Sequence, residues 1–330
     1  MLYLSKKDIE KSFSMSKAIE AAKNSLAIYS KGEAIIPLRV NLGVEKFNGQ
    51  SLFMPGATKG EVDAVGVKIV SVYPDNINKG LPSVPATMVV IDAKTGIVSA
   101  ILDGTFLTQL RTGAVQGAAT DLLARQDAKI GLIIGTGGQA LQQSIAMLTV
   151  RKLRTFYVSD IDLNRAKTFA KQLYEATRDH FTTNIIVADD LSKAVQEADV
   201  ITTVTTSKVA TFNFNDVKPG THINGIGAYT PEMHELPISL IEHADCIFLD
   251  TKDGVLSEAG DIITPLQQGK INEKNITGEL GELVLEKVDG RQNETDITVF
   301  KTVGTAVLDI VTAQLIVENA NEKGLGLKLE

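Results

Sequence analysis

The fold of this chain is decided by the stretch Ile130-Gly-Leu-Ile-Ile-Gly135-Thr-Gly137-Gly-Gln-Ala140. It opens with a short apolar run, typical of a strand covered on both faces, and continues as G-x-G-x-x-A into a helical segment. In such a unit Gly135 permits a tight turn, and Gly137 lets the backbone approach a pyrophosphate. Ala140 lets the helix pack closely on the strand, and the helix N-terminus presents free N–H groups to the phosphates. The stretch therefore predicts the dinucleotide-binding turn of a Rossmann unit.

An acidic residue follows at the place that this unit requires. The next strand-like run, Thr155–Ser159, ends at Asp160, whose carboxylate can accept hydrogen bonds from the ribose hydroxyls of the adenosine. Asp162 is a competing candidate, but it lies two residues past the strand. A carboxylate here would repel a 2′-phosphate, so we expect NAD(H), with NADP(H) kept as an alternative.

Strand-like runs and helices alternate from about Arg111 onward, which indicates a parallel sheet built by βαβ crossovers. After a helix expected at Thr112–Arg125, the runs are Ile130–Ile134, Thr155–Ser159, Asn184–Val187, Val200–Val204, His222–Ile226 and Cys246–Leu249. Ligands of open α/β sheets lie at the carboxyl ends of such strands. We therefore expect the cofactor to contact residues of the glycine loop and of two later strand ends: Thr136, Gly138, Gln139, Thr205, Thr206 and Gly227.

The first third of the chain has a different pattern. Helical periodicity over Ser14–Tyr29 is followed by short runs rich in Val and Ile, with a hairpin turn expected at Asp92–Gly96. The runs are Ile36–Leu42, Ser51–Met54, Ala64–Val72, Ala86–Asp92 and Ile97–Leu102. This part predicts an antiparallel or mixed sheet with an early helix. An amphipathic helix at Thr305–Asn321 is expected to return to it.

Composition narrows the range of partners. The 330 residues suggest about two domains, and the net charge of −7 without a basic patch argues against nucleic acid. Ile130–Val150 lacks charges, but its glycine-rich break favours strand, turn and helix over a membrane span. The single cysteine, Cys246, is expected to be a packed core thiol, and no metal-ligand cluster is evident. With no signal peptide at the N-terminus, we expect a cytoplasmic protein.

Three cations stand in apolar or turn settings of the first part: Arg39 in IIPLRVNL, Lys68 in VGVKIVSV and Arg111 in LTQLRTGAV. Charges in such runs are costly to bury unless they are paired. No acidic partner lies close to them in the sequence, so we expect them to meet an anionic ligand. The alternative for each one is pairing with a distant carboxylate, or a side chain that reaches solvent.

Several segments, in this order, together resemble the ornithine cyclodeaminase/mu-crystallin family over essentially the whole chain. They are PLRVNL, Phe53-Met-Pro-Gly, Val67-Lys-Ile, Gly80-Leu-Pro, Leu110-Arg-Thr-Gly-Ala, the GTGGQA loop, Glu258-Ala-Gly, Gly278-Glu-Leu and Phe300-Lys-Thr-Val-Gly. The resemblance implies a homodimer. It also implies a discontinuous α+β domain for substrate binding and dimerisation (1–112 and 305–330) around a doubly wound Rossmann domain for NAD (113–304).

The resemblance also assigns roles to residues at matching positions. Arg39, Lys68 and Arg111 would hold a substrate carboxylate, with Lys68 and Arg111 taking part in catalysis. Met54 and Ser83 would line the substrate site. Thr112, Val303 and Gly304 would join the cofactor site. A lysine that donates a proton near neutral pH needs a lowered pKa, which burial and neighbouring cations would produce.

Departures from the family pattern guide the choice of reaction. Where cyclodeaminases carry an acidic residue in a Gly-x-Asp-x-Pro stretch, this chain has Tyr229, and a second acidic position is Leu52. Both contacts expected for the side chain of a diamine are therefore missing, and Tyr229 becomes a catalytic or pocket-wall candidate. We expect a reductase of a small cyclic imino acid, such as Δ1-pyrroline-2-carboxylate. The alternatives are ornithine cyclodeaminase, alanine dehydrogenase, and a non-catalytic, crystallin-like binding protein.

Overall fold

A computed structural model describes residues 1–330, apart from the side chain of residue 77. The chain divides into two compact units. The discontinuous unit consists of Met1–Arg111 and Thr305–Glu330, and the central unit consists of Thr112–Gly304. The first division falls inside one long helix, α3 (Gly104–Leu123).

The central unit is built on an eight-stranded parallel sheet in the order β10-β9-β8-β11-β12-β15-β13-β14. Its first five strands follow the order 3-2-1-4-5 of a Rossmann sheet. The strands are β8 (Ile130–Ile134), β9 (Thr155–Ser159), β10 (Asn184–Val187), β11 (Val200–Thr203), β12 (His222–Gly225), β13 (Cys246–Leu249), β14 (Gly278–Glu279) and β15 (Thr298–Lys301). The predicted alternation of strands and helices is confirmed, although the sequence did not reveal β14 and β15.

Both faces of this sheet are covered. Leu132 and Ile134 of β8 belong to one apolar cluster, whereas Ile133 between them belongs to another. Alternate residues of a strand point to opposite faces, so the continuous apolar run reflects burial on both sides. The covering helices, besides α3, are α4 (Ala140–Val150), α5 (Leu163–Thr177), α6 (Leu191–Glu197), α7 (Ile238–His243), α8 (Lys252–Glu258), α9 (Gly260–Gln267) and α10 (Leu280–Val284).

The discontinuous unit contains a mixed sheet in the order β16-β1-β7-β6-β5-β4-β2, with β3 paired to β4. Its β1 is parallel to β7, and its central strands β4 to β7 are antiparallel. The strands are β1 (Leu2–Leu4), β2 (Ala34–Ile35), β3 (Val40–Val44), β4 (Gly49–Thr58), β5 (Val65–Val72), β6 (Ala86–Ile91), β7 (Val98–Asp103) and β16 (Leu327–Lys328). The mixed sheet expected from the sequence is confirmed.

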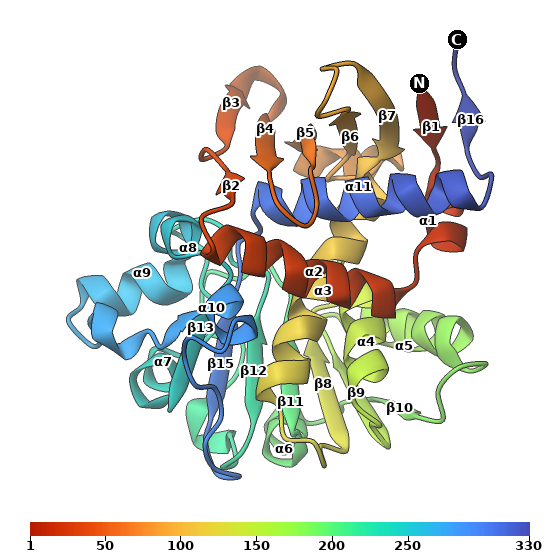
Figure 1. The fold of residues 1–330 in the computed structure, drawn as a ribbon. Helices are drawn as coiled ribbons and strands as arrows, with labels where there is room; N and C mark the ends of the chain where they lie inside the picture. The colour runs from red at the N-terminus through yellow and green to blue at the C-terminus, as the bar shows by residue number, and fades with distance from the viewer. The chain divides into compact units, whose positions relative to one another are not determined.

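Three helices belong to the same unit: α1 (Lys6–Ser12), α2 (Met15–Ser30) and α11 (Ala306–Glu322). The C-terminal helix α11 packs against α2 on one side and against β4, β5 and β6 on the other. In Figure 1 it runs as a blue helix between the strands and the red α2. The last helix of the chain thus completes the core that the first third begins, as the sequence predicted.

Several element boundaries differ from the sequence prediction, and two of the differences have a clear local cause. The run Ile36–Leu42 is not one strand, because β2 ends at Ile35 and β3 begins at Val40. Pro37 lies in this gap and has no N–H to donate to a ladder. The helix expected from Thr112 begins at Gly104, where Asp103 accepts a hydrogen bond from the backbone of Phe106 at 2.9 Å. The hairpin is confirmed, with Gly96 at φ +73°.

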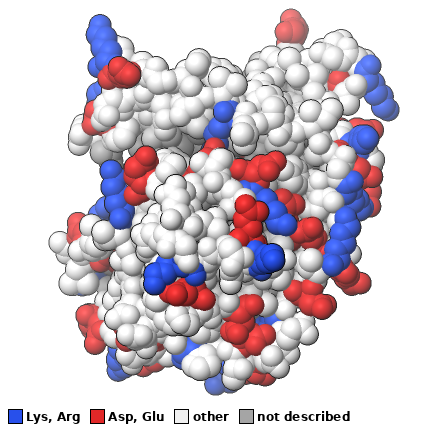
Figure 2. All heavy atoms as spheres, turned by 90° about the vertical axis from the view of Figure 1, so that its left-hand side faces the viewer, with Lys and Arg blue, Asp and Glu red and all other residues white. Residues whose placement is uncertain are grey.

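Two further observations concern the surface and the apolar segments. Among the helices of the described residues, none combines the length and the apolarity that crossing a bilayer requires. On the face drawn in Figure 2, Lys and Arg side chains are interspersed with Asp and Glu, while the upper part is largely uncharged. Cys246 is 7% exposed and unbridged, which confirms it as a packed thiol.

Candidate active site

The glycine loop has the geometry that a pyrophosphate site needs. Gly135 has φ +101°, and a Cβ added there would lie 2.8 Å from the carbonyl oxygen of Val204. Gly137 has no protein atom within 4 Å of an added Cβ. Packing within the protein therefore does not require glycine at 137, whereas close approach of a ligand to the backbone does. Gly138 is exposed beside it, and Ala140 is fully buried at the start of α4.

Asp160 lies at the end of β9 and contacts the glycine loop. Its Oδ2 accepts hydrogen bonds from the backbone N–H of Thr136 at 3.0 Å and from the Thr136 hydroxyl at 2.5 Å. Burial alone would raise the pKa of Asp160, but hydrogen bonds from Thr136 and Asp162 outweigh it and lower the pKa. The carboxylate is thus held ionised beside the loop, the charge state that would repel a 2′-phosphate.

Two strand ends near the loop are joined by a residue that sequence reasoning missed. The carboxylate of Glu235 accepts hydrogen bonds from the backbone and hydroxyl of Thr205, and from the backbone of Gly227 and Ala228. The sequence suggested Thr205 and Gly227 as direct contacts of the cofactor. In the structure, the donors of both residues bind the buried carboxylate of Glu235. Thr206 next to them is exposed.

The Val303–Gly304 segment is held by another buried carboxylate. Oδ2 of Asp250 accepts hydrogen bonds from the backbone of Val303 at 3.2 Å and of Gly304 at 2.8 Å. The Thr302 hydroxyl donates to the same oxygen at 2.5 Å. The two N–H groups are therefore used inside the protein. Among the other cofactor candidates, Thr112 is part of α3 and Gln139 precedes α4, both partly buried.

The discontinuous unit buries a cluster of charged side chains. Lys68 lies on β5, opposite Met54 of β4, and is 1% exposed. Its Nζ is 2.7 Å from Oδ2 of Asp309, while Nε of Arg111 is 2.9 Å from Oδ1 of the same carboxylate. Asp309 belongs to α11 and its side chain is fully buried. One carboxylate from the last helix thus joins a lysine from the sheet to an arginine from α3.

Lys68 and Arg111 therefore show the alternative that the sequence left open, pairing with a distant carboxylate. The partner lies far away in the sequence and reaches the cations only when α11 packs on the sheet. Asp309 could have been found by the same argument that identified Lys68, because it interrupts the apolar run Ala306-Val-Leu-Asp-Ile-Val. Lys301 in Thr-Val-Phe-Lys is a similar missed case, fully buried and paired with Asp261 at 3.0 Å.

A small residue on β4, Gly56, lets α11 approach this closely. Gly56 and Gly66 are directly opposite each other in the sheet. A Cβ added to Gly56 would lie 3.0 Å from Cδ1 of Ile310 and 2.7 Å from Cδ1 of Ile36. Ile310 follows Asp309 in α11, so the close approach of the helix also sets the position of the carboxylate beside Lys68.

The surroundings of Lys68 favour its neutral form. Burial and then the positive charge of Arg111 lower the pKa of Lys68 to about 7, although Asp309 opposes the shift. The charge of Arg39 lowers it further. The depressed lysine pKa expected from burial and neighbouring cations is thus present. Lys68 can gain or lose a proton close to neutral pH.

Arg111 retains an unused donor for a ligand. Its Nη1 is buried and has no hydrogen-bond partner among the described residues. A buried guanidinium N–H without a partner is costly, so this donor is suited to an acceptor such as a carboxylate. Arg39 is partly buried, and its charge acts on Lys68. The structure therefore supports the grouping of the three cations.

The remaining substrate candidates fall in two places. Met54 and Leu52 are both buried on the same face of β4, while Ser83 is partly buried before β6. Tyr229 belongs to the central unit, where it packs partly buried against the apolar cluster of that unit. It directly follows Ala228, whose N–H donates to Glu235 at 2.9 Å.

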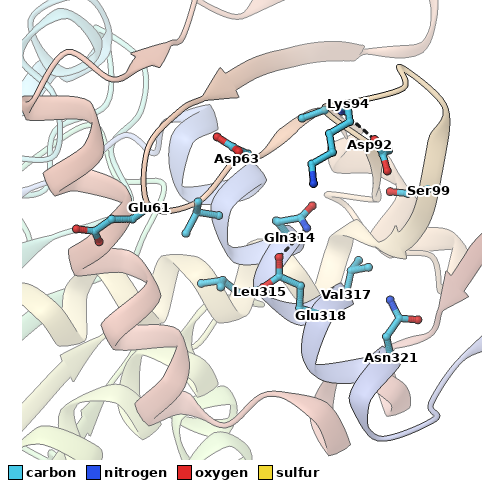
Figure 3. Close-up of a pocket in the computed structure, with 12 residues that line it drawn as sticks. Glu61, Asp63, Asp92, Lys94, Ser99, Gln314, Leu315, Val317, Glu318 and Asn321 are labelled. Carbon is cyan, nitrogen blue, oxygen red and sulfur yellow. Dashed lines mark hydrogen bonds between the residues drawn. The ribbon is translucent and has the colours of Figure 1, made fainter.

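A pocket of about 490 Å³ in the discontinuous unit has a different character. Figure 3 shows Glu61, Asp63, Asp92 and Glu318 around it, with Lys94 reaching in from the hairpin. The residues that line it do not include Arg39, Lys68, Arg111 or Asp309. Its carboxylates would repel an anionic substrate, so the charged cluster is the better candidate for the active site.

Comparisons with known proteins match the chain over almost its whole length or all of it. Residues 1–324 match the model of the "Ornithine cyclodeaminase/mu-crystallin family". A Delta(1)-pyrroline-2-carboxylate reductase of Bacillus cereus is 35% identical over 331 residues, which covers 100% of both chains. The Thermococcus litoralis Delta(1)-pyrroline-2-carboxylate reductase, solved in complex with NADH and L-proline, is 39% identical, with a TM-score of 0.94 and 100% of both chains covered.

A second solved relative extends the comparison to another activity. An archaeal alanine dehydrogenase dimer with bound NAD is 31% identical, with a TM-score of 0.91, covering 100% of this chain and 99% of that one. The family model matches residues 1–324, and the sequence relative and both structures are matched over 100% of this chain. This chain belongs to the ornithine cyclodeaminase/mu-crystallin family.

Proposed function

We propose that this protein is an NADH-dependent reductase of a small cyclic imino acid, with Δ1-pyrroline-2-carboxylate reduced to L-proline as the leading case. The observation that carries the proposal is the buried cluster of Lys68, Arg111 and Asp309, with the pKa of Lys68 lowered to about 7. The relatives in Bacillus cereus and Thermococcus litoralis, both named for this reaction, support the choice of substrate.

The cations are suited to binding the substrate carboxylate. Arg111 directs Nε toward Asp309 and keeps Nη1 without a protein partner, so one edge of the guanidinium is held while another donor serves the ligand. Arg39 adds a second guanidinium near Lys68. Charge-assisted hydrogen bonds of this kind fix the orientation of a planar carboxylate and hence of the adjacent C2 atom.

Lys68 provides the proton that the reaction consumes. NADH, when bound, supplies the hydride that C2 of the imine accepts. The C=N π bond breaks as the new C–H bond forms, and its electron pair takes up a proton at the ring nitrogen. In this proposal the Lys68 ammonium donates that proton and becomes the neutral amine. Asp309, 2.7 Å from Nζ, holds the lysine in place and stabilises its ammonium form when it is reprotonated.

The glycine loop and Asp160 are suited to NADH. Gly137 leaves space for a pyrophosphate against the backbone, and Asp160 presents an ionised carboxylate at the ribose edge. We propose direct contacts from the loop residues Gly135 to Ala140. Thr205, Gly227, Val303 and Gly304 would shape the edge of the site through Glu235 and Asp250.

A diamine substrate fits this chain less well. Leu52 is apolar and buried on the face of β4 that it shares with Met54, the cross-strand partner of Lys68. Tyr229 packs against an apolar cluster. Neither offers a carboxylate to a terminal ammonium group, which ornithine cyclodeamination would require. Alanine dehydrogenase activity is the second candidate, because a relative at 31% identity carries that name.

Substrate assays separate these activities. We expect NADH oxidation with pyrroline-2-carboxylate or piperideine-2-carboxylate, and faster turnover with NADH than with NADPH. Proline and ammonia formed from ornithine at catalytic NAD⁺ would establish the cyclodeaminase instead. NADH consumption only with pyruvate plus ammonia would establish alanine dehydrogenase. Absence of turnover in every assay would favour a binding protein.

The Arg111→Ala variant tests the carboxylate clamp. It removes the donor aimed at the ligand, so we expect kcat/KM for the imine to fall by about a hundredfold or more. Unchanged turnover would contradict the clamp.

We also propose that the protein forms a homodimer through the discontinuous unit. Several large apolar side chains of β2, β3 and the adjoining segments are more than half exposed: Ile35, Leu38, Val40, Leu42 and Phe47. Apolar side chains gathered in this way mark interaction surfaces. The archaeal alanine dehydrogenase is a dimer, which supports a second copy of this chain as the occupant. The single unbridged cysteine suits the reducing cytoplasm, where we place the protein.

A further inference from the structure

Glu235 is a fully buried carboxylate that joins two strand ends of the central unit. Its Oε1 accepts the N–H of Thr205 at 2.5 Å and the hydroxyl of Thr205 at 2.8 Å. Its Oε2 accepts the N–H of Gly227 at 2.5 Å and the N–H of Ala228 at 2.9 Å. The first pair follows β11 and the second follows β12, so each carboxylate oxygen serves one strand end.

The strand ends that Glu235 joins are in close contact. A Cβ added to Gly227 would lie 2.0 Å from the carbonyl oxygen of Thr205, so only glycine fits there. Thr205 in turn approaches the glycine loop, because a Cβ added to Gly135 would lie 2.8 Å from its Cγ2. The Glu235 carboxylate therefore fixes two backbone segments: Thr205, which contacts the cofactor loop, and the segment that carries Tyr229.

A second layer of buried charge holds Glu235 itself. Oδ1 of Asp261 accepts the N–H groups of Glu235 at 2.7 Å and Leu236 at 2.9 Å, and its Oδ2 pairs with Lys301. A Cβ added to Gly260 would lie 2.2 Å from the carbonyl oxygen of Met233, so the start of α9 also presses on this segment. The loop from Gly227 to Glu235 is thus fixed at both ends.

The desolvation of a buried carboxylate is costly, and burial raises the pKa of Glu235 while Lys301 opposes the rise. A site that must hold reacting atoms within a fraction of an ångström needs backbone that is fixed in this way.

We propose that Glu235 is a positioning residue for hydride transfer. It fixes the backbone of Thr205 beside the cofactor loop and the backbone that leads into Tyr229, and so sets the geometry in which the cofactor is held and the position of Tyr229, the pocket-wall candidate. The proposal rests on the imine reduction proposed above.

The test compares Glu235→Gln with a matched control, Asp199→Asn. Asp199 is also buried and accepts two backbone N–H groups, those of Lys129 and Ile130, but it lies at the opposite, amino-terminal edge of the sheet. Both variants replace one carboxylate oxygen by an NH2 group, which cannot accept a hydrogen bond from an N–H. They differ in which edge of the sheet they loosen.

Three readouts distinguish positioning from general stability. For Glu235→Gln we expect kcat, per NADH-binding site counted by calorimetry, to fall by about tenfold to a hundredfold. The dissociation constant for NADH should stay within about threefold, because the glycine loop itself is intact. The ratio of kcat/KM for pyrroline-2-carboxylate over piperideine-2-carboxylate should change. Asp199→Asn should lower the melting temperature while keeping kcat per site and the ratio.

Amide hydrogen exchange provides a measurement that does not depend on the substrate. Exchange at residues 203–208 and 226–230 should accelerate in Glu235→Gln and stay unchanged in Asp199→Asn. Unchanged exchange in Glu235→Gln, or faster exchange with kcat and the substrate ratio both unaltered, would overturn the proposal. If the wild-type protein reduces neither imine, the proposed function fails while the exchange experiment still tests the role of Glu235 in fixing these segments.

Discussion

Lys68 determines how the proposed reaction should depend on pH. Its pKa is about 7 because burial and the charges of Arg111 and Arg39 disfavour the ammonium form, while Asp309 favours it. Each neighbour therefore shifts the titration in a known direction. A lysine with a lowered pKa is protonated below that pKa and becomes neutral as the pH rises through it.

The first prediction concerns the pH profile of imine reduction. If protonated Lys68 is required, kcat/KM is level below about pH 7 and falls about tenfold per pH unit above it. Arg39→Gln removes a cation that lowers the pKa, so the fall should move to higher pH. If the fall of kcat/KM occurs at the same pH in Arg39→Gln and in the wild-type protein, Lys68 is not the proton donor. Using one substrate for both proteins cancels its own titration.

Asp309 gives the second prediction at this scale. Asp309→Asn leaves Lys68 and Arg111 without their buried counter-charge, so stability should fall by about 3–5 kcal/mol. The loss of the negative charge also lowers the pKa of Lys68, which should move the fall of kcat/KM to lower pH. Thermal unfolding and the pH profile measure the two effects. A variant that keeps the wild-type melting temperature would show that the cluster contributes little to the fold.

At the scale of elements, the strand–turn–helix unit around Gly135 could be predicted because all its determinants are local. The turn glycines, the strand before them and the helix after them lie within about a dozen residues of one another. The strands β8, β9, β10 and β13 have the predicted bounds. Short strands such as β1 and β16 could not be predicted, because they are stabilised by pairing with each other and with β7. The pairing of Asp309 with Lys68 and Arg111 could not be predicted for the same reason, because these residues meet only in the tertiary fold.

The third prediction separates the two glycines of this loop. Gly137→Ala adds a methyl group where no protein atom lies within 4 Å, so the melting temperature should hardly change. Affinity for NADH should fall by roughly tenfold, since the methyl group would face the pyrophosphate of the proposed site.

Gly135→Ala is the contrasting variant. Its φ of +101° and the nearby carbonyl of Val204 should make it less stable by about 1–2 kcal/mol or more. Calorimetric titration and thermal unfolding measure both variants. Equal NADH affinity of Gly137→Ala and wild type would contradict the position assigned to the pyrophosphate.

For the whole molecule, the sequence predicted least directly the roles proposed for the two units, cofactor binding by the central unit and substrate binding by the discontinuous unit. The central unit could be identified from its own motif. The role of the discontinuous unit depended on three cations and on a family resemblance, because a site assembled from β5, α3 and α11 has no continuous motif. The reaction proposed for this unit follows from the burial of Lys68, Arg111 and Asp309 in one cluster.

The fourth prediction concerns assembly. Light scattering should give twice the chain mass of 35.4 kDa. Val40→Asp places a charge among the exposed apolar side chains of β3 and should shift the protein toward the monomer, because burying an unpaired carboxylate is costly. Val209→Asp, at a side chain that is 70% exposed in the central unit, is the control and should remain dimeric. A monomeric wild-type protein would contradict the proposed interface.

The stoichiometry of NADH and L-proline, with Δ1-pyrroline-2-carboxylate as substrate, tests imine reduction by this protein directly. Absorbance follows the cofactor while chiral chromatography quantifies the product, with Lys68→Met as the variant lacking the proton donor. We predict one NADH oxidised per L-proline formed by the wild-type protein, and a loss of about a hundredfold or more in Lys68→Met. Proline formation from ornithine without net NADH consumption, combined with no reduction of the imine, would contradict the account.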